Sequence, residues 1–378
     1  MKYYIIAGEA SGDLHGSNLI RELKKHDHSA RVRCWGGDKM EQAGAELVKH
    51  YRDLAFMGFA EVAKNLGTIL QNLKFCKQDI LQFNPDALIL IDYPGFNLRI
   101  ARWAKQHGLK VIYYISPQVW AWKEDRVRSM KKNIDKMIVI IPFEKDYFKN
   151  KWNWNVEYVG HPLVEVIESY KSGVGSEEST KRNSPLTTHH SPLIALLPGS
   201  RKQEIAKKLP IMLEVSRSFP DHQFVVAEAP SVEDEFYQNL TKGYSNVSAV
   251  KNQTYDLLMQ ARAALVTSGT ATLETALFGV PEVVCYKGSS ISYQIAKRVI
   301  KVKYISMVNL IMNKPVVKEL IQHDLTVEKL KHELHELLTN EKRIAEMNKD
   351  YAELKKILSG RGNASANAAK SIVDFLSK

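Results

Sequence analysis

The chain has few cysteines and no long apolar run, and each shortage excludes a class of protein. Its 378 residues include three cysteines, Cys34, Cys76 and Cys285, too far apart for a disulfide scaffold or a C-x-x-C metal site. This usage fits a reducing compartment, so we expect a cytoplasmic protein. The longest strongly apolar runs, such as 137–141, have the length of a strand, whereas a membrane-spanning helix needs about 20 such residues. The first apolar stretch is too short for a signal peptide, so neither export nor a membrane span is expected.

The composition is that of a globular protein with a basic excess. Hydrophobic residues make up 44% and charged residues 25%, and 53 Lys and Arg against 42 Asp and Glu give a formal charge of +11. This charge favours anionic partners without choosing among nucleic acid, phosphorylated metabolites and an acidic membrane face. We expect no nucleic-acid binding, because the basic residues are scattered and no motif is present. We also expect no metal site, because His189 and His190 fall in a linker and His161 stands alone.

Short β-rich runs alternate with helical segments, which is typical of parallel α/β sheets. Strands are expected at 3–7, 31–35, 87–91, 110–115, 136–141 and 157–160, and then at 193–197, 223–227, 247–250, 263–266 and 282–286. The composition predicts an N-terminal Rossmann-like domain over 1–170, a flexible linker or loop over 171–192, a second Rossmann-like domain over 193–325 and helices over 326–378. Two such halves facing across a cleft hold a ligand at the carboxyl ends of their strands.

The first candidate binding loop follows the first expected strand and opens a helix. Its sequence is Gly8-Glu9-Ala10-Ser11-Gly12-Asp13-Leu14-His15-Gly16. Glycines there let the backbone turn tightly, and the amides at a helix start favour anionic or polar groups. The spacing is not G-x-G-x-x-G, and the second strand lacks the acidic end that a dinucleotide site needs. A plain strand-to-helix turn without a ligand is the alternative.

Two loops of the second half occupy the same kind of position and offer groups for phosphate. The first, 196–201, ends in Arg201, whose guanidinium can fork onto a phosphate. The second, 267–274, offers hydroxyls, first-turn amides and the positive end of a helix dipole. Glu274 follows Thr270 by one helical turn, where its carboxylate can accept hydrogen bonds from a ribose diol. The alternatives are ordinary turn chemistry at the first loop and a capped helix at the second.

A carboxylate and two tryptophans in the first half are further candidates. Asp92 stands at the carboxyl end of an apolar strand, where it can take a proton from a hydroxyl nucleophile or stabilise a turn. Trp120 and Trp122 can wall an apolar or sugar pocket or pack in the core.

An amphipathic helix is predicted over 59–80, because apolar residues recur there at spacings of three and four. The preceding 54–59 is unusually apolar for a loop. The helix either packs on a sheet, or this region dips into a bilayer surface or holds an acyl chain, with Lys64, Lys74 and Lys77 near anionic headgroups.

Taken together, these segments resemble the lipid A disaccharide synthases, a family of bacterial glycosyltransferases. The matching motifs fall in family order between residues 5 and about 320, and the ordered set is specific although each motif alone is weak. They are Gly8-Glu9-Ala10-Ser11-Gly12-Asp13, Met57-Gly58-Phe59-Ala60-Glu61-Val62, Ser116-Pro117-Gln118-Val119-Trp120-Ala121-Trp122, Pro142-Phe143-Glu144, Gly160-His161-Pro162, Leu197-Pro198-Gly199-Ser200-Arg201, Ser268-Gly269-Thr270-Ala271-Thr272-Leu273-Glu274 and Asn309-Leu310.

The resemblance implies a GT-B glycosyltransferase with two Rossmann-like domains, in lipopolysaccharide biosynthesis. It joins UDP-2,3-diacylglucosamine to 2,3-diacylglucosamine 1-phosphate through a β-1′,6 bond, by inversion, and releases UDP. The resemblance also implies a peripheral enzyme of the inner membrane and a homodimer that exchanges carboxyl-terminal elements. Alternatively, the C-terminal helices pack back on the N-terminal domain. Fixed amides and a guanidinium supply the positive charge, so we expect no cofactor and no metal in the chemistry.

The expected site divides into three groups of residues. Asp92 and Arg201 are the expected catalytic residues. The expected UDP-binding residues are Gly199, Ser200, Arg201, Ser268, Gly269, Thr270, Ala271, Glu274 and Asn309. The expected acceptor-binding or acyl-binding residues are Glu9, Ser11, Gly12, Asp13, Met57, Phe59, Trp120 and Trp122.

One departure from the family pattern leaves the catalytic base open. The family often has Asp-x-Pro-Asp-Phe-Asn at 92–97, and the second Asp, a favoured base, is Gly95 here. We expect Asp92 to act as the catalytic base, and Glu9, Asp13 and His15 are the alternatives. Other functions that remain open are a UDP-sugar epimerase or another GT-B enzyme, a nicotinamide-dependent oxidoreductase, and a non-catalytic sugar-nucleotide sensor.

Overall fold

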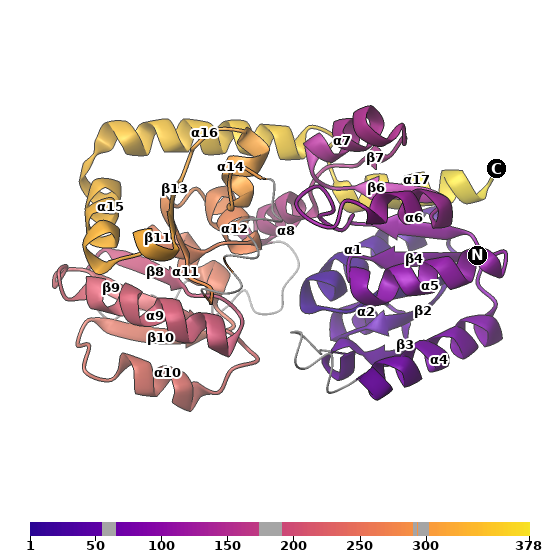
Figure 1. Cartoon of the computed structure of the whole chain (residues 1–378), viewed down its shortest axis with the longest axis horizontal. Helices are drawn as coiled ribbons and strands as arrows, with labels where there is room; N and C mark the ends of the chain where they lie inside the picture. The colour runs from indigo at the N-terminus through magenta and orange to yellow at the C-terminus, as the bar shows by residue number, and fades with distance from the viewer. Residues whose placement is uncertain (55–65, 174–190, 290–292, 294–301) are drawn as a thin grey trace. The chain divides into compact units, whose positions relative to one another are not determined.

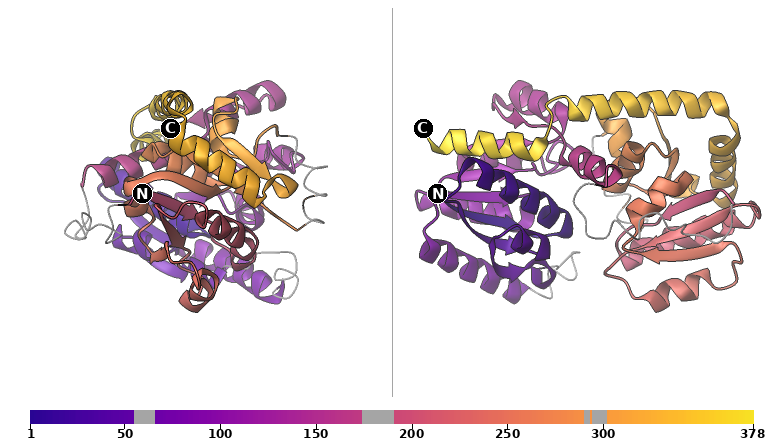
Figure 2. Two further views of the ribbon diagram at one scale, coloured as in Figure 1. Left: turned by 90° about the vertical axis from the view of Figure 1, so that its left-hand side faces the viewer. Right: turned by 180° about the vertical axis from the view of Figure 1, so that it is seen from behind.

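The computed structural model describes residues 1–54, 66–173, 191–289, 293 and 302–378. Contacts divide the chain into two compact units (Figures 1 and 2). Unit 1 combines Met1–Pro162 with Leu358–Lys378, and unit 2 is Leu163–Ile357. No helix within these described ranges is both long enough and apolar enough to span a bilayer.

Unit 1 is built on a parallel sheet with the order β3-β2-β1-β4-β5-β6-β7. Its strands are β1 (Lys2–Ala7), β2 (Arg31–Gly36), β3 (Glu46–His50), β4 (Ala87–Ile91), β5 (Val111–Tyr114), β6 (Lys136–Val139) and β7 (Glu157–Tyr158). Its helices are α1 (Ala10–His26), α2 (Asp38–Gln42), η1 (Tyr51–Leu54), α4 (Leu66–Phe83), α5 (Pro94–Gln106), α6 (Arg126–Asn133), α7 (Pro142–Trp152) and α17 (Ala364–Leu376). The strand order reverses between β1 and β4, and loops at the carboxyl ends of two such strands form the usual ligand position of an open α/β sheet.

Unit 2 repeats this plan with the order β10-β9-β8-β11-β12-β13, all parallel. Its strands are β8 (Leu193–Leu197), β9 (Gln223–Glu228), β10 (Val247–Lys251), β11 (Ala261–Thr267), β12 (Glu282–Tyr286) and β13 (Lys318–Ile321). Its helices are α8 (Pro162–Lys171), α9 (Lys202–Ser216), α10 (Asp234–Thr241), α11 (Thr254–Gln260), α12 (Thr270–Phe278), α14 (Met307–Met312), η2 (Gln322–Asp324), α15 (Val327–Thr339) and α16 (Glu341–Ser359), the last of which ends in unit 1. Here the reversal falls between β8 and β11.

The expected fold class, two parallel α/β units, is confirmed, and the sequence missed one edge strand in each sheet. β3 and β13 lie at the edges and have only one buried residue between them. An edge strand with mixed exposure does not show the continuous apolar run of a strand buried on both faces. Interior strands such as β4, buried at every position, do show it.

The unit boundaries differ from the domain boundaries expected from composition. The composition changes only at 171, but α8 already belongs to unit 2, where Tyr170 Oη donates to Asp256 Oδ1 (2.7 Å) and Lys171 Nζ to the Leu277 carbonyl (3.0 Å). The C-terminal helices divide as well, because α15 and most of α16 belong to unit 2 while α17 packs along α1 in unit 1 (Figure 2).

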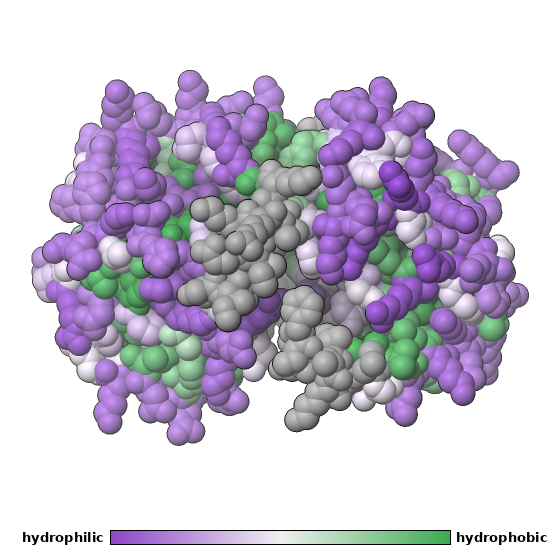
Figure 3. Space-filling model, viewed as in Figure 1, coloured by the Kyte–Doolittle hydropathy of each residue, from purple (hydrophilic) through white to green (hydrophobic). Residues whose placement is uncertain are grey.

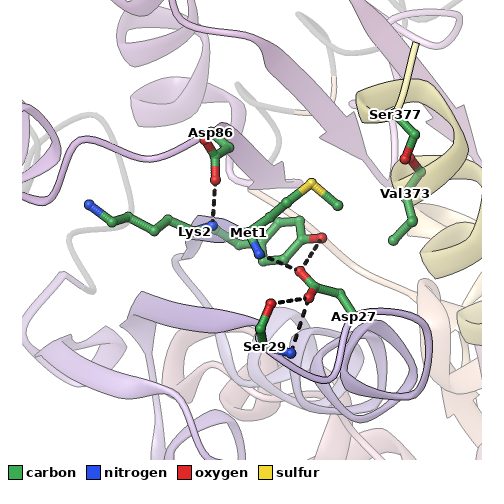
Figure 4. A network of polar contacts seen from close by, with 8 residues as sticks. Met1, Lys2, Asp27, Ser29, Asp86, Val373 and Ser377 are labelled. Atoms are coloured by element: carbon green, nitrogen blue, oxygen red, sulfur yellow. Dashed lines mark hydrogen bonds and ion pairs between the residues drawn. The ribbon is translucent and has the colours of Figure 1, made fainter.

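Both ends of the chain are held in unit 1. The Met1 ammonium bonds Asp27 Oδ2 at 2.6 Å, and the Lys2 amide donates to Asp86 Oδ2 at 2.7 Å (Figure 4). Asp27 also accepts the Ser29 amide at 3.1 Å, so one carboxylate joins the chain start to the end of α1. At the other end, Asn367 of α17 donates to the Val159 carbonyl at 3.1 Å.

A buried ionic cluster fastens α4 to the sheet of unit 1. Asp79, 4% exposed, accepts a 2.5 Å hydrogen bond from Tyr4 Oη and lies 2.9 Å from the Arg33 guanidinium. Burial, reinforced by Asp79, raises the pKa of the Tyr4 phenol, so Tyr4 remains a donor. Removing one member of such a buried cluster leaves the others unsatisfied.

We expect Asp79→Ala to lower the free energy of unfolding of unit 1 by about 2–4 kcal/mol, because Tyr4 and Arg33 lose their shared acceptor. All six tryptophans lie between 35 and 154, so urea titration followed by tryptophan fluorescence reports on unit 1. Asp374→Ala, which removes an exposed pairing with Lys370 on α17, is the control and should change little. Equal effects of the two substitutions would contradict a structural role for the cluster.

Candidate active site

Two loops of unit 2 meet at the strand-order reversal because β8 and β11 are adjacent and parallel, with Leu197 beside Val266. The chain after β8 turns at Gly199 (φ 120°) and starts α9 with Arg201 as its N-cap. The chain after β11 turns at Gly269 (φ 126°), the N-cap of α12. Such φ values favour glycine. Two helix N-termini therefore lie together at the carboxyl ends of these two strands. The first-turn N–H groups of each helix have no acceptor inside the helix.

These loops enclose a pocket of about 510 Å³. Its lining residues are Leu197, Gly199, Ser200, Arg201, Glu204, Ala227, Glu228, Ala229, Pro230, Thr254, Thr267, Ser268, Gly269, Thr270, Ala271 and Glu274. The pocket thus brings together every expected UDP-binding residue except Asn309. Hydroxyls, helix-start amides and one guanidinium suit it to a phosphorylated ligand.

Arg201 lies at the pocket with its side chain 61% exposed, and its Nη1 is 3.3 Å from Glu204 Oε1. The other Glu204 oxygen is 3.6 Å from Nζ of Lys208, which is only 2% exposed and donates to Thr267 Oγ1. Burial lowers the pKa of Lys208, and Glu204 opposes that shift. The sequence motifs did not indicate Lys208. Its position in the sequence does indicate burial, because Lys208 falls on the same helix face as the apolar residues Ile205, Leu209 and Met212.

Glu274 stands on the pocket wall with Thr270, as their spacing predicts. Tyr255 Oη donates to Glu274 Oε1 at 2.8 Å. Burial raises the pKa of Glu274, and the Tyr255 hydrogen bond opposes this shift. The carboxylate retains acceptor capacity for a hydroxylated ligand.

Asn309 does not line this pocket. It is 1% exposed, and its amide bonds the Val317 carbonyl at 2.9 Å, the Val317 N–H at 2.9 Å and Glu319 Oε1 at 3.0 Å. It fixes α14, which packs against α12. Its place in the structure is therefore that of a support behind the pocket helix.

In unit 1, the loops after β1 and β4 also lie at a strand-order reversal, with Ala7 beside Ile91. Asp92 follows β4 in a left-handed conformation (φ 43°), as does Tyr93 (φ 47°). The Asp92 carbonyl accepts hydrogen bonds from Tyr113 Oη (2.5 Å) and Asn97 Nδ2 (2.8 Å), which hold this strained turn. Burial, with a smaller contribution from the charge of Glu9, raises the pKa of the Asp92 carboxyl to about 7.

The loop after β1 contacts both the start of α2 and the turn after β4. Asp13 accepts the N–H groups of Gly37 (2.8 Å), Lys39 (3.2 Å) and Met40 (3.1 Å), so it caps α2 and is a poor candidate for base or acceptor ligand. A Cβ on Gly8 would lie 2.3 Å from the Tyr93 ring, so only glycine lets these loops approach.

The remaining residues of this loop divide by exposure. Gly12 is buried with its Cα hydrogen toward Ala7, where a Cβ would lie 3.1 Å from the alanine Cβ. Glu9 is half-buried and Ser11 is exposed. Of the expected acceptor-binding residues in this loop, Glu9 and Ser11 are therefore the two that are not buried.

The two tryptophans have different surroundings. Trp120 packs edge-on against Phe143 and donates from Nε1 to Glu144 Oε1 at 3.1 Å. Glu144 is fully buried, and burial raises its pKa to about 8. Trp122 is 45% exposed, with the Lys123 ammonium 4.3 Å from its ring centroid. Met57 and Phe59, the other expected acyl contacts, lie outside the described residues.

Two histidines are buried in unit 1, namely His15, an alternative for the catalytic base, and His161. Burial lowers the pKa of His15 to about 4 and, together with the nearby His15, that of His161 to about 3. Both rings are therefore neutral near pH 7. His15 Nδ1 has no hydrogen-bond partner among the described residues. Across the described part of the chain, no three His, Cys, Asp or Glu side chains gather as metal ligands.

Comparison with known proteins gives a consistent family. The profile of the family described as lipid-A-disaccharide synthetase matches residues 3–374. The lipid-A-disaccharide synthase of Geobacter sulfurreducens is 36% identical over 99% of this chain and 97% of its own. That of Syntrophus aciditrophicus is 37% identical over 97% and 96%, and that of Coxiella burnetii 35% identical over 98% of each.

Solved structures with the same fold are more distant in sequence. UDP-GlcNAc 2-epimerase from Neisseria meningitidis bound to UDP-GlcNAc has a TM-score of 0.71 at 14% identity, covering 99% of this chain and 100% of its own. The kitacinnamycin glycosyltransferase has a TM-score of 0.68 at 14% identity, covering 99% and 98%. These likenesses establish the GT-B fold.

The raised pKa of Asp92 predicts a pH-dependent cost in stability. Because the folded pKa of about 7 exceeds the unfolded value, the folded state binds the proton more tightly, and stability is lost as pH rises from about 4 to 7. We expect Asp92→Asn to raise the free energy of unfolding of unit 1 by about 1–3 kcal/mol more at pH 8 than at pH 4.5. Urea titration followed by tryptophan fluorescence measures this. The exposed Asp53→Asn is the control, and an equal pH response in both variants would refute the shift.

Proposed function

Because this chain belongs to the lipid-A-disaccharide synthetase family, we propose that it joins UDP-2,3-diacylglucosamine to 2,3-diacylglucosamine 1-phosphate. It is a glycosyltransferase of lipid A biosynthesis. The acceptor hydroxyl oxygen attacks the anomeric carbon of the donor as the bond from that carbon to the UDP oxygen breaks. The products are the β-1′,6-linked disaccharide 1-phosphate and UDP, and the hydroxyl proton passes to a base.

The single observation that carries the donor half of this proposal is the unit 2 pocket. The leaving UDP gains negative charge in the transition state, and charge stabilisation by fixed donors is commonly the largest contribution to such catalysis. Arg201 and the N-termini of α9 and α12 supply fixed positive charge there. Glu274, one helical turn from Thr270, is suited to the ribose hydroxyls.

Asp92 is the proposed base of the acceptor half. A base works best with a pKa near the working pH, and the pKa of Asp92 is about 7. Gly95, where the family often has a second aspartate, is exposed, and a Cβ built on it has no neighbour within 4 Å. Gly95 has no side chain to accept the proton, and we assign the role to Asp92. Glu9, Ser11 and Trp122 are proposed acceptor contacts.

The acyl chains of both substrates favour a protein that works at the cytoplasmic face of the inner membrane. On α4, Leu70 is 57%, Phe75 46% and Leu81 53% exposed, with Lys74 exposed beside them. Figure 3 shows hydrophobic side chains on the surface in the region where Figure 1 places α4. Apolar side chains flanked by lysine suit the interface of an anionic bilayer. We therefore propose peripheral attachment through α4, which cosedimentation with anionic vesicles tests.

We also propose a homodimer in which the segment from α16 onward is exchanged. The basis is that α17 completes unit 1 from the far end of the chain, so the α17 of a second copy can make the same contacts with α1. Light scattering of the purified protein measures the mass that decides between monomer and dimer.

Arg201→Ala should lower kcat for disaccharide formation by about 100-fold or more, because it removes a preorganised charge from the leaving diphosphate. Mass spectrometry of the product measures the rate with both diacylated substrates. Arg217→Ala, at the other end of α9 and paired with Glu214, is the control. An Arg201→Ala rate within a few-fold of wild type would remove Arg201 from the site.

The base should appear in the pH profile of kcat/KM. Since Asp92 must be deprotonated to accept the proton, kcat/KM should rise with pH up to about 7 and then level off. Asp92→Asn should lose about 10²–10⁴-fold in rate. Glu9→Gln should move the rise to lower pH, because Glu9 contributes to the raised pKa of Asp92. If the pH profile of Glu9→Gln superimposed on that of wild type, Glu9 would not contribute to the pKa of the catalytic base.

A further inference from the structure

Lys208 is a buried cation in a position that packing alone would give to an apolar side chain. It lies inside α9 on the face of Ile205, Leu209 and Met212, each fully buried, and is itself only 2% exposed. Burying an ammonium costs several kcal/mol unless its partners compensate. A chain that keeps this charge in a core face therefore has contacts there that repay it.

The polar contacts of Lys208 with Thr267 and Glu204 lead to the pocket of unit 2. Its Nζ donates to Thr267 Oγ1 and lies 3.6 Å from Glu204 Oε2. A Cβ on Gly199 would be 3.5 Å from the same Nζ, so the ammonium lies directly under the turn after β8. Thr267, Glu204 and Gly199 all line the pocket, whereas Lys208 does not. The charge stands one layer behind the pocket surface.

The contact with Thr267 fixes the direction of a hydroxyl. An ammonium can only donate, so Thr267 Oγ1 accepts from Lys208, and its own O–H is left to donate elsewhere. Thr267 lines the pocket. A hydroxyl fixed as a donor in this way suits a phosphate oxygen and disfavours a cation.

The contact with Glu204 affects the charge of Arg201. Glu204 lies between two cations, with Oε1 3.3 Å from Arg201 Nη1 and Oε2 3.6 Å from Lys208 Nζ. Without Lys208, one carboxylate would face one guanidinium, and their charges would cancel. With Lys208 present, the three groups carry a net positive charge at the edge of the pocket.

We propose that Lys208 is a positioning residue for the diphosphate of the sugar nucleotide, acting through Thr267 and through the Glu204–Arg201 pair. This inference rests on the proposed function, because it assumes that the pocket takes a nucleoside diphosphate. Its distinguishing feature is selectivity: Lys208 acts on the phosphates and leaves recognition of the nucleoside unaffected.

Calorimetric titration of full-length Lys208→Met with UDP and with uridine tests this. We expect the Kd for UDP to rise at least about tenfold, as for the loss of a charged hydrogen bond, with the Kd for uridine unchanged. The melting temperature should stay the same or rise, because methionine fits an apolar face. Lys207→Met, the exposed neighbour on the same helix, is the control and should bind UDP as wild type does.

Thr267→Val provides a second variant that keeps the lysine and removes only the hydroxyl. We expect the same selective loss of UDP affinity. The double variant Lys208→Met with Thr267→Val should lose less than the product of the two single losses, because both act through one hydrogen bond.

Unchanged UDP affinity in both single variants would overturn the inference, as would equal weakening of UDP and uridine. Failure of the proposed function has a different signature, namely wild-type protein that forms no disaccharide from the two diacylated substrates. If that protein still bound UDP in a Lys208-dependent way, the inference would stand while the proposed function fell. Wild-type protein that did not bind UDP would overturn both.

Discussion

Parallel pairing of neighbouring strands at the strand-order reversal is the constraint on which the candidate site depends. In unit 2, β8 and β11 run side by side in the same direction, so the turns that follow them reach the same sheet edge. Each turn leads into a helix, and the two helix starts then lie together without any long-range signal in the sequence. The same pairing of β1 with β4 brings the Gly8 turn to Asp92 in unit 1. The backbone alone therefore places helix N-termini, which in general favour anions, at the carboxyl ends of these strands.

Each unit also carries ionisable groups whose burial opposes folding. Glu144 and Glu274 are held in surroundings that favour their neutral forms, and Asp92 sits on a left-handed turn. A protein selected for stability alone would replace such groups with apolar ones. Glu274 lines the pocket of unit 2 and Asp92 follows β4 in unit 1, and burial raises the pKa of each carboxyl group.

The sequence predicted the parts of the structure that depend on local pattern. Interior strands such as β4 are continuously apolar, and glycine with hydroxyl residues after β8 and β11 indicated the two turns that line the pocket of unit 2. It did not predict β3 and β13, whose exposed edges lack that pattern. Asn309 was assigned to the pocket from the resemblance, but its amide bonds the chain behind it. Lys208 was missed because a lysine in a helix ordinarily faces solvent, and only the register of its apolar neighbours shows otherwise.

Unit 1 is discontinuous in the sequence, since α17 joins it after the whole of unit 2 has intervened. During synthesis on the ribosome, the surface of α1 that α17 covers emerges long before its partner does. The first Rossmann-like unit therefore remains without one of its helices until Ala364–Leu376 has been synthesised, whereas unit 2 has all its strands and the start of α16 beforehand. Domains generally fold in the order of their synthesis, but unit 1 is complete only when Leu358–Lys378 has joined it.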